Sequence, residues 1–196
     1  MEDNLGEAII TCITAAAGEF DIEKQQGLLK AAAYGKAFCA DLDPFEFVDT
    51  ARKIRVLNEV RGSDIGLPLT YNQFSRLTPE VLVGRLCIRK FHFLALKICE
   101  LLGVNDDRIV IHWAQCKIAQ LSKTTATDDE IALLIQRKLK PYMNKISFLD
   151  IAASAYRLGR RRLAILILDF ETHTADQVPL LLSMGDEELG RPPSSS

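Results

Sequence analysis

The sequence lacks the features by which most enzymes and nucleic-acid-binding proteins are recognised. A formal net charge of −2 over 196 residues gives no electrostatic reason to expect nucleic acid or an anionic membrane as the main partner. None of the motifs GxxxxGK[ST], HExxH, CxxC and GxSxG occurs, so the usual phosphate-binding loops, metalloprotease helices and nucleophile elbows are absent. We therefore predict that the chain is not an enzyme and uses no cofactor.

Cysteine and histidine are few and widely separated. The five cysteines are odd in number and at least twelve residues apart, which is typical of free thiols in a reducing cytosol and not of a disulfide framework or a zinc site. They are Cys12, Cys39, Cys87, Cys99 and Cys116. The histidines His92, His112 and His173 are isolated in the sequence, and His112, beside Trp113, is expected to have a structural role. The sequence thus predicts no metal site.

Long apolar runs are missing as well. No apolar stretch approaches the roughly 20 residues that are needed to span a bilayer. Glu2 and Asp3 stand where a secretory signal would carry positive charge. We therefore expect a soluble protein of the cytoplasm.

The pattern that is present is helical. Apolar residues recur at three- and four-residue steps along most of the chain, which is typical of amphipathic helices. Asp43-Pro44 and Thr78-Pro79 are typical helix starts, and Gly103 and Gly159 stand where helices end. A Ser147 to Asp150 pair resembles a capping box. Helices are expected over residues 4–17, 23–38, 44–62, 70–77, 78–89, 93–102, 107–121, 127–139, 147–158 and 163–168, and a further helix is expected to start before Leu182.

A weak internal repeat predicts how these helices are arranged. Placing the stretch from Arg85 over the stretch from Ser154 aligns Leu94 with Leu163, Ala95 with Ala164 and Ile98 with Ile167. The offset of 154 − 85 = 69 residues is two units of about 34, the length of one helical hairpin repeat. We therefore predict an all-α fold, an α-solenoid of stacked antiparallel helical hairpins. The expected parts are residues 1–80, residues 81–185 as the partner-binding repeats, and residues 186–196 as a disordered tail or an artificial end.

The helix expected over residues 107–121 has a wider apolar surface than one-sided packing requires. Its apolar positions cover an arc of roughly 220°, against an arc of about 100° for a helix packed on one side. Either neighbouring repeats cover both ends of the arc, or another protein covers the edge formed by Ile111, Ala114 and Ile118. In the second case Ala114 would be open to water in the free chain, and Ala114→Asp would abolish binding without unfolding the protein.

Three arginines at the turn near Gly159 form the most basic patch. A solvated turn is one interpretation, in which reversing Arg160 and Arg161 changes stability little; a site for phosphate or lipid head groups is the other. The loop that contains His173 is expected on the same side as the Ala114 edge. The candidate partner-binding residues are Ile111, Ala114, Gln115, Ile118, Arg157, Arg160, Arg161 and His173.

Several segments together resemble a known family. They are RKIRVLNEVRGSDIGLPLTYNQFSRLTPEVLVGRL at 52–86, KICELLGV at 97–104, HWA at 112–114, SFLDIAASAYRLGRRRLAI at 147–165 and DQVPLLLSM at 176–184. In order and spacing, from about Phe45 to Met184, they are similar to the C-terminal region of the vacuolar protein sorting-associated protein 16 family. Members of that family are longer and carry an N-terminal β-propeller, so the resemblance implies that this chain is a piece of a solenoid.

The resemblance implies a non-enzymatic scaffold of the HOPS and CORVET tethering complexes. Such a scaffold would bind a Sec1/Munc18-family subunit, vacuolar protein sorting-associated protein 33, together with other subunits of the complexes. It would lie in the cytoplasm, peripherally on vacuolar, lysosomal and late-endosomal membranes. Two alternatives stay open: the metazoan paralogue that pairs with a second form of the Sec1/Munc18 subunit, and a small phosphoinositide-binding helical module that uses the arginine turn.

Overall fold

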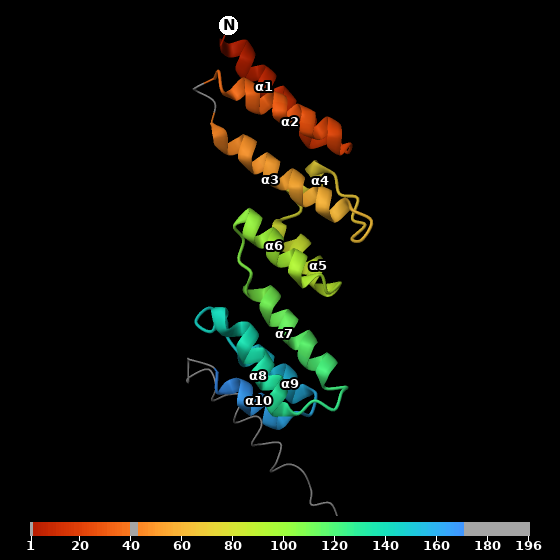
Figure 1. Ribbon diagram of the computed structural model, residues 1–196, viewed down its shortest axis with the longest axis vertical. Coiled ribbons are helices and arrows are strands. Elements are labelled where there is room, and N and C mark those ends of the chain that lie inside the picture. The colour runs from red at the N-terminus through yellow and green to blue at the C-terminus, as the bar shows by residue number, and fades with distance from the viewer. Residues whose placement is uncertain (1, 40–42, 171–196) are drawn as a thin grey trace, which may run out of the picture. The chain divides into compact units, whose positions relative to one another are not determined.

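The computed structural model describes residues 2–39 and 43–170. Within these ranges the chain forms ten α-helices, one short 3-10 helix and no strand, which confirms the all-α prediction (Figure 1). None of the helices in these ranges is long and apolar enough to cross a membrane. The helices are α1 (Glu2–Gly18), α2 (Ile22–Lys36), α3 (Pro44–Arg61), α4 (Tyr71–Arg76), α5 (Pro79–Ile88), α6 (His92–Leu102), α7 (Asp107–Leu121), α8 (Asp128–Leu139), η1 (Lys140–Tyr142), α9 (Leu149–Arg157) and α10 (Arg161–Leu168).

The chain divides into two compact units. Unit 1 comprises residues 1–83 and 97–104, and unit 2 comprises residues 84–96 and 105–196. In unit 1, α1 packs against α2 and α3. Two apolar clusters hold these helices together, and their buried members are Ile9, Ile13, Ala32, Ala16, Ala17 and Ile54.

A buried amide joins the first three helices of unit 1. Gln25 on α2 is only 1% exposed, and its Nε2 donates to the carbonyl oxygens of Ala16 at 3.2 Å and Glu19 at 3.1 Å. Its Oε1 accepts a hydrogen bond of 2.6 Å from Asn58 Nδ2 on α3. The last carbonyls of a helix have no partner within the helix, so Gln25 supplies a donor where α1 ends.

In unit 2, α9 packs against α7 and α10, and α8 packs against α7 and α10. α10 therefore lies beside both α8 and α9 (Figure 1). Their inward faces form one apolar core, which is built largely from Ile, Leu and Ala because a close helix–helix approach needs small residues between larger ones. Its fully enclosed members include Ala114, Ile118, Ile131, Ile135, Phe148, Ile151, Ala152, Ala155, Leu163, Ala164 and Ile167.

Most predicted helix ends are confirmed. Thr127 and Glu130 form a complete capping box at the start of α8. The side chain of Asp43, the residue before Pro44, accepts a hydrogen bond from the Phe45 amide at the start of α3. The expected capping box at Ser147 differs. Phe148 is the N-cap of α9 and makes no side-chain cap bond, while the Ser147 hydroxyl accepts from the Leu149 amide at 3.2 Å.

The two aligned segments of the internal repeat share one turn geometry. Gly159 has φ 77°, its amide donates to Tyr156 O, and the Arg160 amide donates to Ala155 O, which is the Schellman motif. Lys90, aligned with Gly159, has φ 67°, and the corresponding bonds run from Lys90 to Cys87 and from Phe91 to Leu86. The two aligned segments therefore form the same hairpin turn. The stacking of hairpins into a solenoid and the division of the chain into three parts stay predictions.

Replacing Gly159 in the Schellman turn and Gly84 inside α5 by alanine should change the free energy of unfolding in opposite directions. A Cβ at Gly159 would meet nothing within 4 Å, so Gly159→Ala should lower the free energy of unfolding by about 1 kcal/mol through the left-handed backbone alone. Gly84 lies inside α5, also with open space around its Cα, and Gly84→Ala should raise stability by about 0.5–1 kcal/mol. Denaturant titration of both variants measures the two shifts. Equal shifts would contradict the assigned backbone conformations.

Candidate functional site

The structure places the predicted edge of α7 inside the core. Ala114 and Ile118 are both 0% exposed and belong to the apolar core of unit 2. The expectation that Ala114 is open to water is therefore wrong, because α7 packs against α8 and α9 on this side. Ile111 and Gln115 are half-buried, and Gln115 Nε2 donates to Asp150 O at 3.1 Å.

The arginine turn between α9 and α10 is not simply solvated. Arg160 Nη1 contacts Asp128 Oδ1 at 2.7 Å and donates to Ala126 O at 3.0 Å, and both side chains of the ion pair are only 20% exposed. Arg162 pairs with Asp129 at 2.9 Å, but both of those side chains are largely exposed. The interpretation of Arg160 as part of a solvated turn is therefore wrong, because its guanidinium ties this turn to the loop before α8.

Other residues of the turn remain accessible. Arg157 and Leu158 are exposed, and Leu158 is 46% exposed although it is a large apolar side chain. A cavity of about 310 Å³ is lined by Tyr156, Arg157, Gly159 and Arg161. We call these residues, together with Leu158, the α9–α10 surface. His173 lies outside the described residues.

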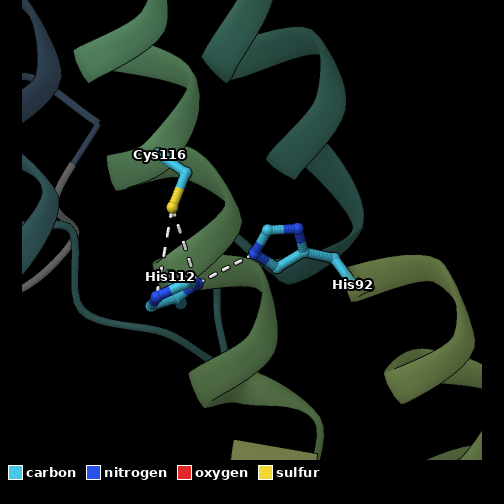
Figure 2. A group of neighbouring side chains, drawn as sticks. All are labelled: His92, His112 and Cys116. Carbon is cyan, nitrogen blue, oxygen red and sulfur yellow. Dashed lines mark hydrogen bonds between the residues drawn. The ribbon is translucent and has the colours of Figure 1, made fainter. Parts of the chain in front are cut away.

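A second group of functional side chains was not expected from the sequence. Figure 2 shows His92 at the start of α6 pointing toward His112 and Cys116 on α7. His92 Nε2 lies 2.8 Å from His112 Nδ1, and Cys116 Sγ lies 3.7 Å from the same Nδ1. Burial, and after it the neighbouring His112, lowers the pKa of His92. These three residues of unit 2 form the His–His–Cys cluster.

The sequence gives only a weak indication of the His–His–Cys cluster. His112 and Cys116 are four residues apart, so they lie on one face of α7. At 100° per residue this face is about 160° away from the Ala114 and Ile118 edge, which means that His112 and Cys116 lie on the side of α7 opposite its contact with α8 and α9. His92, twenty residues earlier, joins them only through tertiary structure, and spacing alone does not reveal that contact.

Two family models match the chain. The model described as Vps16, N-terminal region, matches residues 1–49. The model described as Vps16, C-terminal region, matches residues 146–190. The second match contains α9 and α10 and therefore the α9–α10 surface. The similarity thus begins earlier in the chain than about Phe45, where the resemblance was expected to begin.

Curated relatives extend the similarity over almost the whole chain. Protein VACUOLELESS1 of Arabidopsis thaliana is 40% identical over 188 residues, which cover 96% of this chain and 22% of the relative. The vacuolar protein sorting-associated protein 16 homolog of Dictyostelium discoideum is 40% identical over 189 residues, again 96% of this chain and 22% of the relative. The homolog of Drosophila melanogaster is 39% identical over 178 residues, which cover 90% of this chain and 21% of the relative.

These matches make the chain similar to a segment of vacuolar protein sorting proteins. The proteins that it matches over most of its length are homologues of vacuolar protein sorting-associated protein 16. It spans about 22% of the length of the relatives that it matches.

Proposed function

We propose that this chain is a non-enzymatic scaffold segment of a Vps16-type subunit of the HOPS and CORVET tethering complexes. It binds a Sec1/Munc18-family subunit, vacuolar protein sorting-associated protein 33, and so promotes SNARE-mediated fusion in vesicle trafficking. It acts on the cytoplasmic side of vacuolar, lysosomal and late-endosomal membranes, which it reaches through the complex. The observation that carries this proposal is the 40% identity, across 96% of the chain, to a relative named for vacuolar protein sorting.

The α9–α10 surface is our candidate contact for the Sec1/Munc18 subunit. The surface presents an exposed arginine next to an exposed leucine. Arginine is enriched at interface hot spots, and a neighbouring apolar contact would help to exclude water from it. Arg161 lines the same cavity as Arg157. Ile111 and Gln115, half-buried on α7, would lie at the rim of the contact.

The buried candidates would act indirectly. Ala114 and Ile118 fix α7 against its neighbours in the core, and Arg160 fixes the turn through Asp128. Substitutions at these three positions would weaken binding by displacing the α9–α10 surface. A variant that separates binding from folding therefore has to be made at an exposed residue.

Arg157→Glu is expected to weaken the complex at least about tenfold, which corresponds to 1.4 kcal/mol. Its thermal melt should stay within a few degrees of the parent, because the side chain is exposed. The matched control is Lys138→Glu, which has the same change of charge at an exposed position of α8. Binding is measured by co-purification and by titration of the full chain with the purified Sec1/Munc18 subunit.

Three outcomes would contradict the proposal or its assignment of the surface. No binding by the parent chain would reject the proposed partner. Equal weakening by Arg157→Glu and Lys138→Glu would indicate a general charge effect and not a contact of the α9–α10 surface. Binding of the parent to phosphoinositide vesicles, with none to the Sec1/Munc18 subunit, would favour a head-group site instead.

A further inference from the structure

We propose that His92, His112 and Cys116 form a binding site for a divalent transition metal, with Zn²⁺ as the best-fitting ion. The three side chains offer two imidazole nitrogens and one sulfur that lie within 4.8 Å of one another. They come from the start of α6 and from one face of α7, so the site is assembled by tertiary structure. It lies entirely within unit 2.

The distances between donor atoms fit one shared ion. A tetrahedral Zn²⁺ with Zn–N near 2.0–2.1 Å and Zn–S near 2.3 Å places two nitrogens about 3.3 Å apart and a nitrogen and a sulfur about 3.6 Å apart. The observed separation of Cys116 Sγ and His112 Nδ1 is 3.7 Å. The two imidazole nitrogens are 2.8 Å apart, a hydrogen-bond distance that has to widen by roughly half an ångström when the ion replaces the shared proton.

The chemistry of the donors selects the class of metal. Imidazole and thiolate together favour Zn²⁺, Co²⁺ and copper over Mg²⁺ and Ca²⁺, which prefer oxygen ligands. Three protein ligands leave one position of the tetrahedron open to water or to a fourth residue.

The experiment titrates the tag-free full chain with CoCl₂ and ZnCl₂ near neutral pH. Co²⁺ should bind with one equivalent per chain and produce sulfur-to-cobalt charge-transfer absorption, which Zn²⁺ then displaces. Saturating ZnCl₂, at about 100 times the dissociation constant, should raise the melting temperature by roughly 5–10 °C. Cys116→Ser, a change of one atom at a half-buried position, should abolish the charge-transfer band and weaken Zn²⁺ binding at least about tenfold, since even loss of a residue that supports a ligand has an effect of that size.

Matched controls distinguish this site from other thiols and histidines. Cys12→Ser changes a half-buried cysteine of unit 1 and should leave stoichiometry and affinity unchanged. His92→Ala should reduce affinity while keeping the helical circular dichroism of the parent. Absence of one-to-one binding in the micromolar range, or binding that survives both Cys116→Ser and His92→Ala, would overturn the proposal.

Discussion

Ala114→Asp is expected to unfold unit 2 and to lose partner binding as a consequence. Ala114 is 0% exposed and lies in the apolar core with residues of α8, α9 and α10. An aspartate there either buries an unpaired charge or takes up a proton, and in both cases it overfills a closely packed site. We expect the free energy of unfolding to fall by more than about 4 kcal/mol.

Ala119→Asp is the matched control for this substitution. It makes the same chemical change on the same helix, at a half-buried position, and should lower stability by about 1 kcal/mol. Chemical denaturation followed by circular dichroism compares the two variants with the parent. A parent-like melt of Ala114→Asp combined with lost partner binding would contradict the core assignment and place Ala114 at the interface.

Arg160→Glu is expected to destabilise unit 2 by about 3 kcal/mol, because it removes a largely buried ion pair and sets two carboxylates against each other. Arg160 now bonds both Asp128 and the Ala126 carbonyl. The substitution would leave that carbonyl without its charged donor. For a chain of this length the melting temperature should fall by roughly 6–12 °C.

The neighbouring ion pair supplies the control. Arg162→Glu breaks the pair with Asp129, whose side chains are 71% and 60% exposed, and should change stability by no more than about 1 kcal/mol. Thermal melts of both variants at low and high salt provide the comparison. If the two variants melt alike, the Arg160 contact contributes no more than an exposed pair, and the earlier expectation of a dispensable turn would stand.

Helix ends were predicted well because their signals are local. A capping box needs only residues three apart, and the box of Thr127 and Glu130 begins α8 where a helix over residues 127–139 was expected. The alignment that predicted the repeat also places Lys90 opposite Gly159, and both residues adopt the left-handed conformation of a Schellman motif. The Ser147 start failed in detail because Phe148 is completely buried, so packing of that ring moves the helix start by one residue.

What covers a helix face could not be predicted from one sequence. The 220° arc of α7 showed that two neighbours were needed, but not whether they belonged to the same chain. In unit 2, α8 and α9 cover Ala114 and Ile118, and His92 approaches His112. Arg160 and Asp128 are 32 residues apart, a separation at which charge patterns in a sequence specify no pairing.

The buried amide of Gln25 has a consequence for the uniqueness of the packing in unit 1. Apolar clusters such as those of Ile9, Ile13 and Ala32 tolerate a helix that slides by one turn, because one aliphatic contact replaces another. A slide of α2 along α1 would instead pull the Gln25 amide, which is 1% exposed, away from the Ala16 and Glu19 carbonyls and leave that buried amide without these two acceptors. Gln25 therefore sets the axial register of α1, α2 and α3, and so excludes neighbouring arrangements that hydrophobic burial alone would accept.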